Sequence, residues 1–117
     1  MKKTILVVED DGGRRKAMVE ALTGAGYDVI AGDDFAAALQ TVERLGIDVM
    51  ISDLQLSAAT PRGQALRRLA QRRAATKLLF VSRAPVPSGR RASPPDVLPL
   101  PLDRTQLLDK VRLLLAS

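Results

Sequence analysis

Five short apolar runs alternate with amphipathic stretches along the chain. The first run, Thr4 to Val8, is uninterrupted and rich in β-branched residues, which is typical of a strand buried on both faces. The other runs are Tyr27 to Ala31, Asp48 to Ser52, Lys77 to Val81 and Val97 to Leu100. Strands that alternate with helices predict a doubly wound α/β fold with a parallel sheet.

The stretches between these runs carry apolar residues at helical spacing. We expect helices over 13–23, over a segment capped by Asp33 or Asp34 and ended by Gly46, over 63–73, and after Asp103, with Gln106 at the third helical position. Segment 83–95 contains four prolines, so an ordinary fourth helix cannot form across it.

Length and composition exclude several classes of protein. With 117 residues, we expect a single domain over residues 1–117 and no output domain. The absence of Cys and His excludes disulfides, thiolate metal sites and imidazole catalysis. The amino-terminal apolar run is too short for a signal peptide or a membrane span, so we expect a cytoplasmic protein.

The net charge of +5 is unevenly distributed. Residues 1–53 carry ten acids and six bases, 54–95 carry nine bases and no acid, and 96–117 carry three of each. The basic segment suggests a solvated arginine face, a surface that docks an acidic partner, or a nucleic-acid surface. The residues of the last hypothesis are Arg62, Arg67, Arg68, Arg72, Arg73, Arg90 and Arg91. We favour the solvated face, because base-stacking aromatics are missing from this segment apart from Phe80 in a predicted buried strand.

Polar residues with related chemistry follow three of the predicted strands. Glu9 and Asp10 follow the first strand, Asp53 follows the third and Ser82 follows the fourth. If the first and third strands are neighbours, their carboxylates converge at the edge of the sheet where ligands bind in such folds. Carboxylates without a nearby His or Cys favour a hard ion such as Mg²⁺, and an aspartate beside it can accept a phosphoryl group.

The sequence resembles the receiver domain of two-component response regulators over nearly its whole length. The resemblance depends on ILVVEDD at 5–11, DVMISDLQL at 48–56, Ser82 after a hydrophobic strand, and PLD at 101–103. It implies a flavodoxin-like five-stranded sheet in the order 2-1-3-4-5.

The resemblance also implies a role for each site residue. Asp53 would be the phosphoacceptor and would also bind Mg²⁺, together with Glu9, Asp10 and the backbone carbonyl of Gln55. Ser82 would hydrogen-bond the phosphoryl group. The donor would be a phosphohistidine on a sensor kinase or a phosphotransfer protein. Such a protein phosphorylates and dephosphorylates itself at most, and does not turn over a small substrate.

Several positions depart from the family pattern. The usual lysine before the proline is Leu100, and the usual aromatic of the same strand is Val97. Ser57, Thr60 and Pro61 replace the usual proline, acidic residue and glycine of the loop after the acceptor. Arg83, next to Ser82, is a candidate to supply the missing cation.

Three hypotheses follow for the function. In the first, Asp53 is phosphorylated and switching is atypical. The second is a pseudo-receiver that binds protein partners without phosphorylation, and the third is nucleic-acid binding. We favour the first, because the acids and the hydroxyl are all present. The downstream target and homodimer formation stay open.

Overall fold

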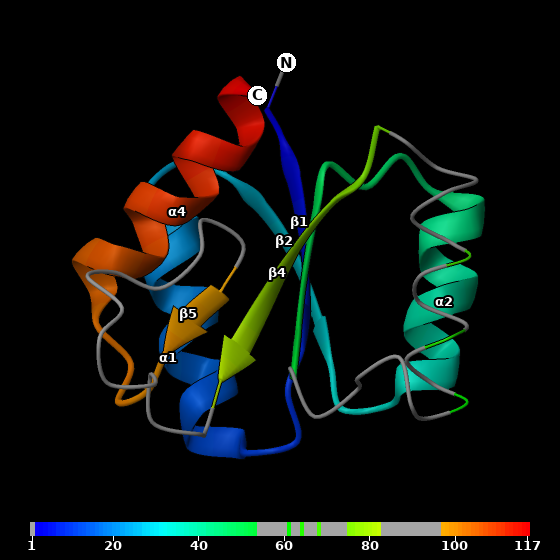
Figure 1. The fold of residues 1–117 in the computed structure, drawn as a ribbon, viewed down its shortest axis with the longest axis horizontal. Coiled ribbons are helices and arrows are strands. Elements are labelled where there is room, and N and C mark those ends of the chain that lie inside the picture. Colours follow the sequence, from blue (N-terminus) through cyan, green and yellow to red (C-terminus); the bar gives the residue numbers. More distant parts are fainter. Residues whose placement is uncertain (1, 54–60, 62–63, 65–67, 69–74, 83–96) are drawn as a thin grey trace.

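Five parallel strands form the centre of the fold in the computed structural model (Figure 1). The structure describes residues 2–53, 61, 64, 68, 75–82 and 97–117. The strands are β1 (Thr4–Val8), β2 (Asp28–Gly32), β3 (Val49–Asp53), β4 (Lys77–Ser82) and β5 (Val97–Pro99). Their order, β2-β1-β3-β4-β5, confirms the predicted doubly wound sheet.

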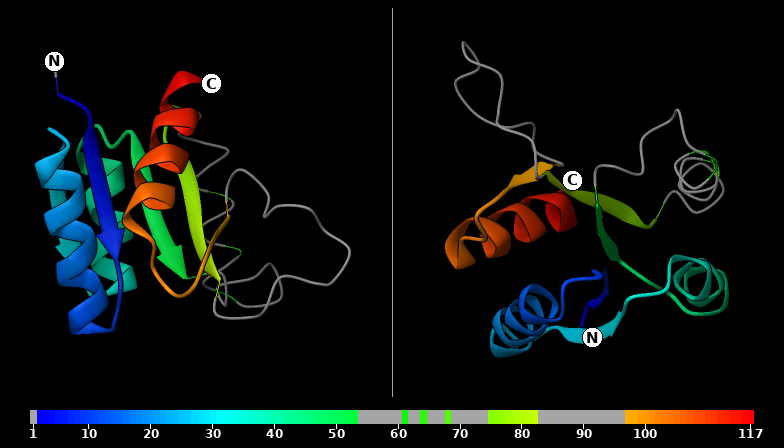
Figure 2. Two further views of the ribbon diagram at one scale, coloured as in Figure 1. Left: turned by 90° about the vertical axis from the view of Figure 1, so that its left-hand side faces the viewer. Right: turned by 90° about the horizontal axis from the view of Figure 1, so that it is seen from below.

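Helices cover both faces of this sheet. The described helices are α1 (Gly12–Gly24), α2 (Phe35–Arg44) and α4 (Arg104–Ala116). Helices α1 and α4 contact one another on one face, and α2 lies against the other face (Figure 2). Gln64 and Arg68 are helical and exposed, and the rest of the third predicted helix, like segment 83–95, lies outside the described residues. No helix within the described ranges is both long and apolar enough to cross a bilayer.

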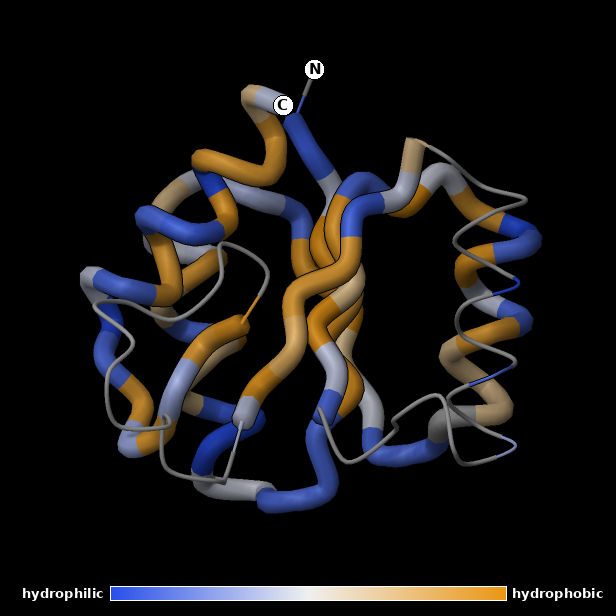
Figure 3. Tube along the Cα trace, viewed as in Figure 1, coloured by the Kyte–Doolittle hydropathy of each residue, from blue (hydrophilic) through white to orange (hydrophobic). Residues whose placement is uncertain are grey.

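Two hydrophobic cores lie on the two faces of the sheet, which explains the uninterrupted apolar strands. The core beneath α1 and α4 contains Ile5, Val7, Met18, Leu22, Val49, Ile51, Leu79, Leu98, Leu107 and Val111. The core beneath α2 contains Leu6, Ala38, Val42, Ile47 and Met50. In Figure 3 the most hydrophobic colours follow the central strands, while hydrophilic colours gather in the loops at the lower edge.

Each described helix begins at an aspartate that follows a strand. The carboxylates of Asp11, Asp34 and Asp103 accept hydrogen bonds from the backbone N–H groups of Arg14, Ala36 and Gln106 at 3.2, 3.0 and 3.0 Å. These contacts satisfy N–H groups that have no partner within the helix. The predicted caps at Asp103 and, of the two alternatives, at Asp34 are thereby confirmed.

Some element boundaries differ from the prediction by one or two residues. Helix α2 ends at Arg44 with Leu45 as its C-cap, before Gly46, and β2 begins at Asp28 and continues to Gly32. Strands β3 and β4 extend through Asp53 and Ser82, because backbone pairing continues past the last apolar residue. Both candidate site residues are therefore fixed within the sheet.

The core beneath α1 and α4 gives a stability prediction with a matched control. Leu22 of α1 is fully buried, whereas Leu113 of α4 is 62% exposed. We expect Leu22→Ala to lower the free energy of unfolding by about 2–5 kcal/mol, since it removes buried apolar surface and leaves a cavity. Leu113→Ala should change it by about 0.5 kcal/mol or less. Urea denaturation checks both values, and equal losses would contradict the described packing.

Candidate functional site

The carboxyl ends of β1, β3 and β4 bring three of the predicted site residues to neighbouring positions. The β1–β3 register ends with the pair Val7 and Ile51, and Glu9 and Asp53 each lie two residues beyond that pair. The β3–β4 register pairs Asp53 with Val81, so Ser82 is one residue further along the next strand. Neighbouring strands are about 4.8 Å apart, and the strand order reverses between β1 and β3, where ligands bind in open α/β sheets.

These side chains differ in burial. Side chains alternate along a strand, so Glu9 continues the series of Ile5 and Val7, which face α1 and α4. By the same alternation Asp53 follows Ile51 on that face. Glu9 is 5% exposed and Ser82 7% exposed, Asp53 is half-buried, and Asp10 is exposed. Part of the site is therefore screened from water.

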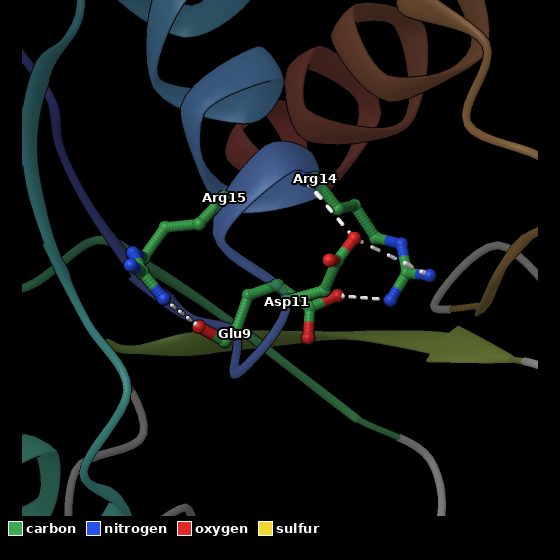
Figure 4. A network of polar contacts seen from close by, with 4 residues as sticks. All are labelled: Glu9, Asp11, Arg14 and Arg15. Carbon is green, nitrogen blue, oxygen red and sulfur yellow. Dashed lines mark hydrogen bonds and ion pairs between the residues drawn. The ribbon is translucent and has the colours of Figure 1, made fainter.

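Arg14, in the first turn of α1, holds the Glu9 carboxylate (Figure 4). Its Nη1 donates to Glu9 Oε1 at 2.7 Å, and its Nη2 is 3.8 Å from Asp11 Oδ2. The hydrogen bond from Arg14 to Glu9 raises the pKa of Arg14, burial opposes that rise, and the charges of Glu9, Asp11 and Asp10 add to it. Arg14 is therefore a permanent cation within the acidic edge.

The backbone of Glu9 is fixed as well. Its carbonyl oxygen accepts a hydrogen bond from Nη1 of Arg15 at 2.7 Å (Figure 4). Its N–H donates to the carbonyl of Gly32 at 3.0 Å. Two consecutive arginines therefore bind different parts of one glutamate. The sequence analysis did not identify either arginine as a site residue. Both lie in the first turn of a helix that follows the acidic residues at the end of a strand, and this position could have indicated them.

The oxygen donors at this edge of the sheet are of the kind that Mg²⁺ prefers as ligands. Within the part of the chain that the structure describes, no group of three or more acidic side chains is placed to hold a metal ion. Carboxylate oxygens are supplied at this edge by Glu9, which pairs with Arg14, and by Asp10 and Asp53 near the ends of β1 and β3. Magnesium usually binds through one or two carboxylates and keeps several waters, so this donor set fits the ion.

A match to a known family model identifies the family of this chain. The family model described as "Response regulator receiver domain" matches residues 5–112. The chain belongs to the receiver domain family. It is therefore a receiver of two-component signalling, a family whose members typically bind Mg²⁺ and generally partner with histidine kinases.

Solved structures agree with this receiver fold. A response regulator from Thermotoga maritima has a TM-score of 0.81 and 23% identity, with 100% of both chains covered. A putative response regulator from Chloroflexus aurantiacus J-10-fl has the same TM-score and coverage, with 24% identity. A CheY-like receiver domain protein from Methanospirillum hungatei JF-1 has a TM-score of 0.79 and 20% identity, covering 99% of this chain and 95% of that one. A search of curated protein sequences finds no match.

The structure locates some of the positions that the sequence analysis interprets as departures from the family pattern. Leu100 is half-buried and packs against the core beneath α1 and α4, and Val97 is half-buried in β5. Pro61 is exposed. The remaining positions of interest, Gln55, Ser57, Thr60 and Arg83, lie outside the described residues, as do all arginines of the predicted basic surface except Arg68.

The N-cap of α1 gives a prediction about the stability of the helix that carries Arg14 and Arg15. Asp11→Ala removes the acceptor for the backbone N–H of Arg14, so we expect the free energy of unfolding to fall by about 1 kcal/mol. Asp11→Asn keeps a capping oxygen and should cost less than about 0.5 kcal/mol. Chemical denaturation distinguishes the two variants. Equal losses would mean that the charge of Asp11, rather than its cap, stabilises the helix.

Proposed function

We propose that this receiver accepts a phosphoryl group from a phosphohistidine onto Asp53 in a Mg²⁺-dependent reaction. The observation that carries the proposal is the register of the sheet, which sets Glu9, Asp53 and Ser82 at the ends of three adjacent strands. A sensor histidine kinase or a phosphotransfer protein would supply the donor. This chain has no histidine, so the donor histidine belongs to the partner.

In this proposal a carboxylate oxygen of Asp53 attacks phosphorus as the P–N bond to the donor imidazole breaks. The imidazole nitrogen keeps the bonding electron pair and takes up a proton, and the product is an aspartyl phosphate. The Ser82 hydroxyl would donate a hydrogen bond to one phosphoryl oxygen. Slow attack by water would later release phosphate and restore the carboxylate.

Glu9, Asp10, Asp53 and the backbone carbonyl of Gln55 would hold Mg²⁺. When bound, the ion supplies positive charge beside the phosphoryl oxygens. The half-buried setting of Asp53 supports this role, because charges interact more strongly where water is partly excluded.

We further propose that switching is atypical. Leu100 belongs to the hydrophobic packing beneath α1 and α4, so a contact between the phosphate and a lysine at this position is not available. Val97 replaces the usual aromatic and has no ring to reorient. Arg83 stays a candidate for the missing cation on the strength of its adjacency to Ser82.

The second candidate function is a pseudo-receiver that binds its partners without phosphorylation. Two observations favour it: the Glu9 carboxylate is already neutralised by Arg14, and Leu100 is apolar. Nucleic-acid binding is a weaker third candidate, which the exposed Arg68 supports only by its charge. A steep loss of binding with salt would be its signature.

The Asp53 proposal is tested by intact mass. After incubation with Mg²⁺ and phosphoramidate, whose P–N bond resembles that of phosphohistidine, we expect the wild type to gain one phosphoryl group. Asp53→Asn should gain none, because the nucleophilic carboxylate is gone. Asp10→Asn should react more slowly, whereas Asp109→Asn, which changes an exposed carboxylate of α4 outside the proposed site, should react like the wild type.

Absence of a mass gain in the wild type, with phosphoramidate and with cognate kinase alike, would support the pseudo-receiver instead. A gain that persists in Asp53→Asn would refute the choice of Asp53 as the acceptor.

Two buried serines allow a matched test of the hydroxyl. Ser82→Ala should slow phosphorylation roughly 10- to 100-fold, because a hydrogen bond to a charged phosphoryl oxygen is lost. Ser52 is also buried, and its Oγ has no hydrogen-bond partner among the residues that the structure describes. Ser52→Ala should leave the rate unchanged and keep or slightly raise stability. Equal rates for the two variants would remove Ser82 from the proposed site.

A further inference from the structure

Arg14 adds to this site a cation that no part of the proposed reaction uses. We propose that Arg14 is a built-in counter-ion of the acidic edge, and that its ion pair with Glu9 sets how tightly the site binds a divalent cation. The inference deepens the proposed function, because it depends on the same carboxylates holding Mg²⁺. It makes Arg14 a positioning and affinity-setting residue and not a ligand.

The ion pair is well fixed and poorly screened. Arg14 Nη1 and Glu9 Oε1 are 2.7 Å apart, and the two side chains are 22% and 5% exposed. Asp11 caps the turn that carries Arg14, so the guanidinium extends from a defined point of α1. Charges that are partly removed from water interact more strongly than exposed ones and respond less to salt.

Arg14 pairs with Glu9 on the sheet face to which strand alternation also assigns Asp53. Glu9 and Asp53 both continue strand alternations that face α1 and α4. On that same face, the end of β5 contributes Leu100 to the core and no positive charge. The positive charge that the described residues supply there thus comes from α1, at the opposite side of the site from β5.

A guanidinium and a divalent cation compete for the same negative potential. The pKa of Arg14 is raised first by its hydrogen bond to Glu9, and the charges of Asp11 and Asp10 contribute as well. Asp10 therefore acts on Arg14, although it is also a proposed metal ligand. Removing the guanidinium would leave more negative charge for the metal ion, so the affinity for that ion should increase.

Arg15 provides a matched control. It has the same charge, occupies the next position in the same turn, and donates at the same distance of 2.7 Å. Its partner is the Glu9 carbonyl oxygen, however, so it leaves the carboxylate charge in place. A specific role of the Arg14 pair predicts a larger effect for Arg14 than for Arg15.

The test is calorimetric titration of the full chain with MgCl₂, without any phosphodonor. We compare the wild type with Arg14→Met, Arg14→Lys and Arg15→Met. Arg14→Met should bind Mg²⁺ on the order of tenfold more tightly, Arg14→Lys should remain near the wild type because it keeps the charge, and Arg15→Met should show a clearly smaller gain. Thermal unfolding without Mg²⁺ identifies effects on folding alone.

Several outcomes would overturn the inference. Unchanged or weaker binding by Arg14→Met would mean that Arg14 only orders Glu9. An equal gain in Arg15→Met would assign the effect to the general charge of the turn. If neither the wild type nor Arg14→Met binds Mg²⁺, the inference and the metal half of the proposed function both fail. If Asp53 is phosphorylated with Mg²⁺ but Arg14→Met leaves the affinity unchanged, only the inference fails.

Discussion

The parallel pairing of β1 with β3 is the constraint on which the rest of the structure depends. Both strands are buried on both faces, and a slip by one residue would exchange the side chains of the two cores. At the amino ends of the strands, the N–H of Thr4 donates to the Asp48 carboxylate at 2.8 Å, and the N–H of Asp48 donates to the carbonyl of Thr4 at 2.9 Å. These bonds fix the register at the edge opposite the site, and Glu9 and Asp53 each follow the last pair of this register by two residues.

The sequence was sufficient to predict the sheet, because each buried strand is an uninterrupted apolar run and helix caps follow the strands. The ends of the strands were less predictable. Asp53 and Ser82 are polar, so a reading based on apolar runs stops before them, whereas the backbone ladder includes both. Helix α2 likewise ends at Arg44, because Leu45 adopts an extended backbone before the glycine that had marked its end is reached.

The residue types of the site could be predicted as well, since polar residues at the carboxyl ends of neighbouring parallel strands must meet at one edge. The side chains that contact these residues could not be predicted. The contact between Arg14 and Glu9 depends on the direction in which α1 leaves β1 and on the conformation of a long side chain, and neither has a periodic signature. The role of Leu100 was predictable only as the absence of a lysine, and its packing into a core is a property of the folded chain.

The location of Arg14 on a helix has a mechanical consequence. A cation at the end of β5 would belong to an edge strand of three residues, whereas Arg14 belongs to a helix of 13 residues. Helix α1 packs against the edge strand β2 and against β1 as well as against α4, so its position is tied to both the sheet and the neighbouring helix. A change in the charge balance at the acidic edge would therefore act first on the packing of α1 against β2, β1 and α4.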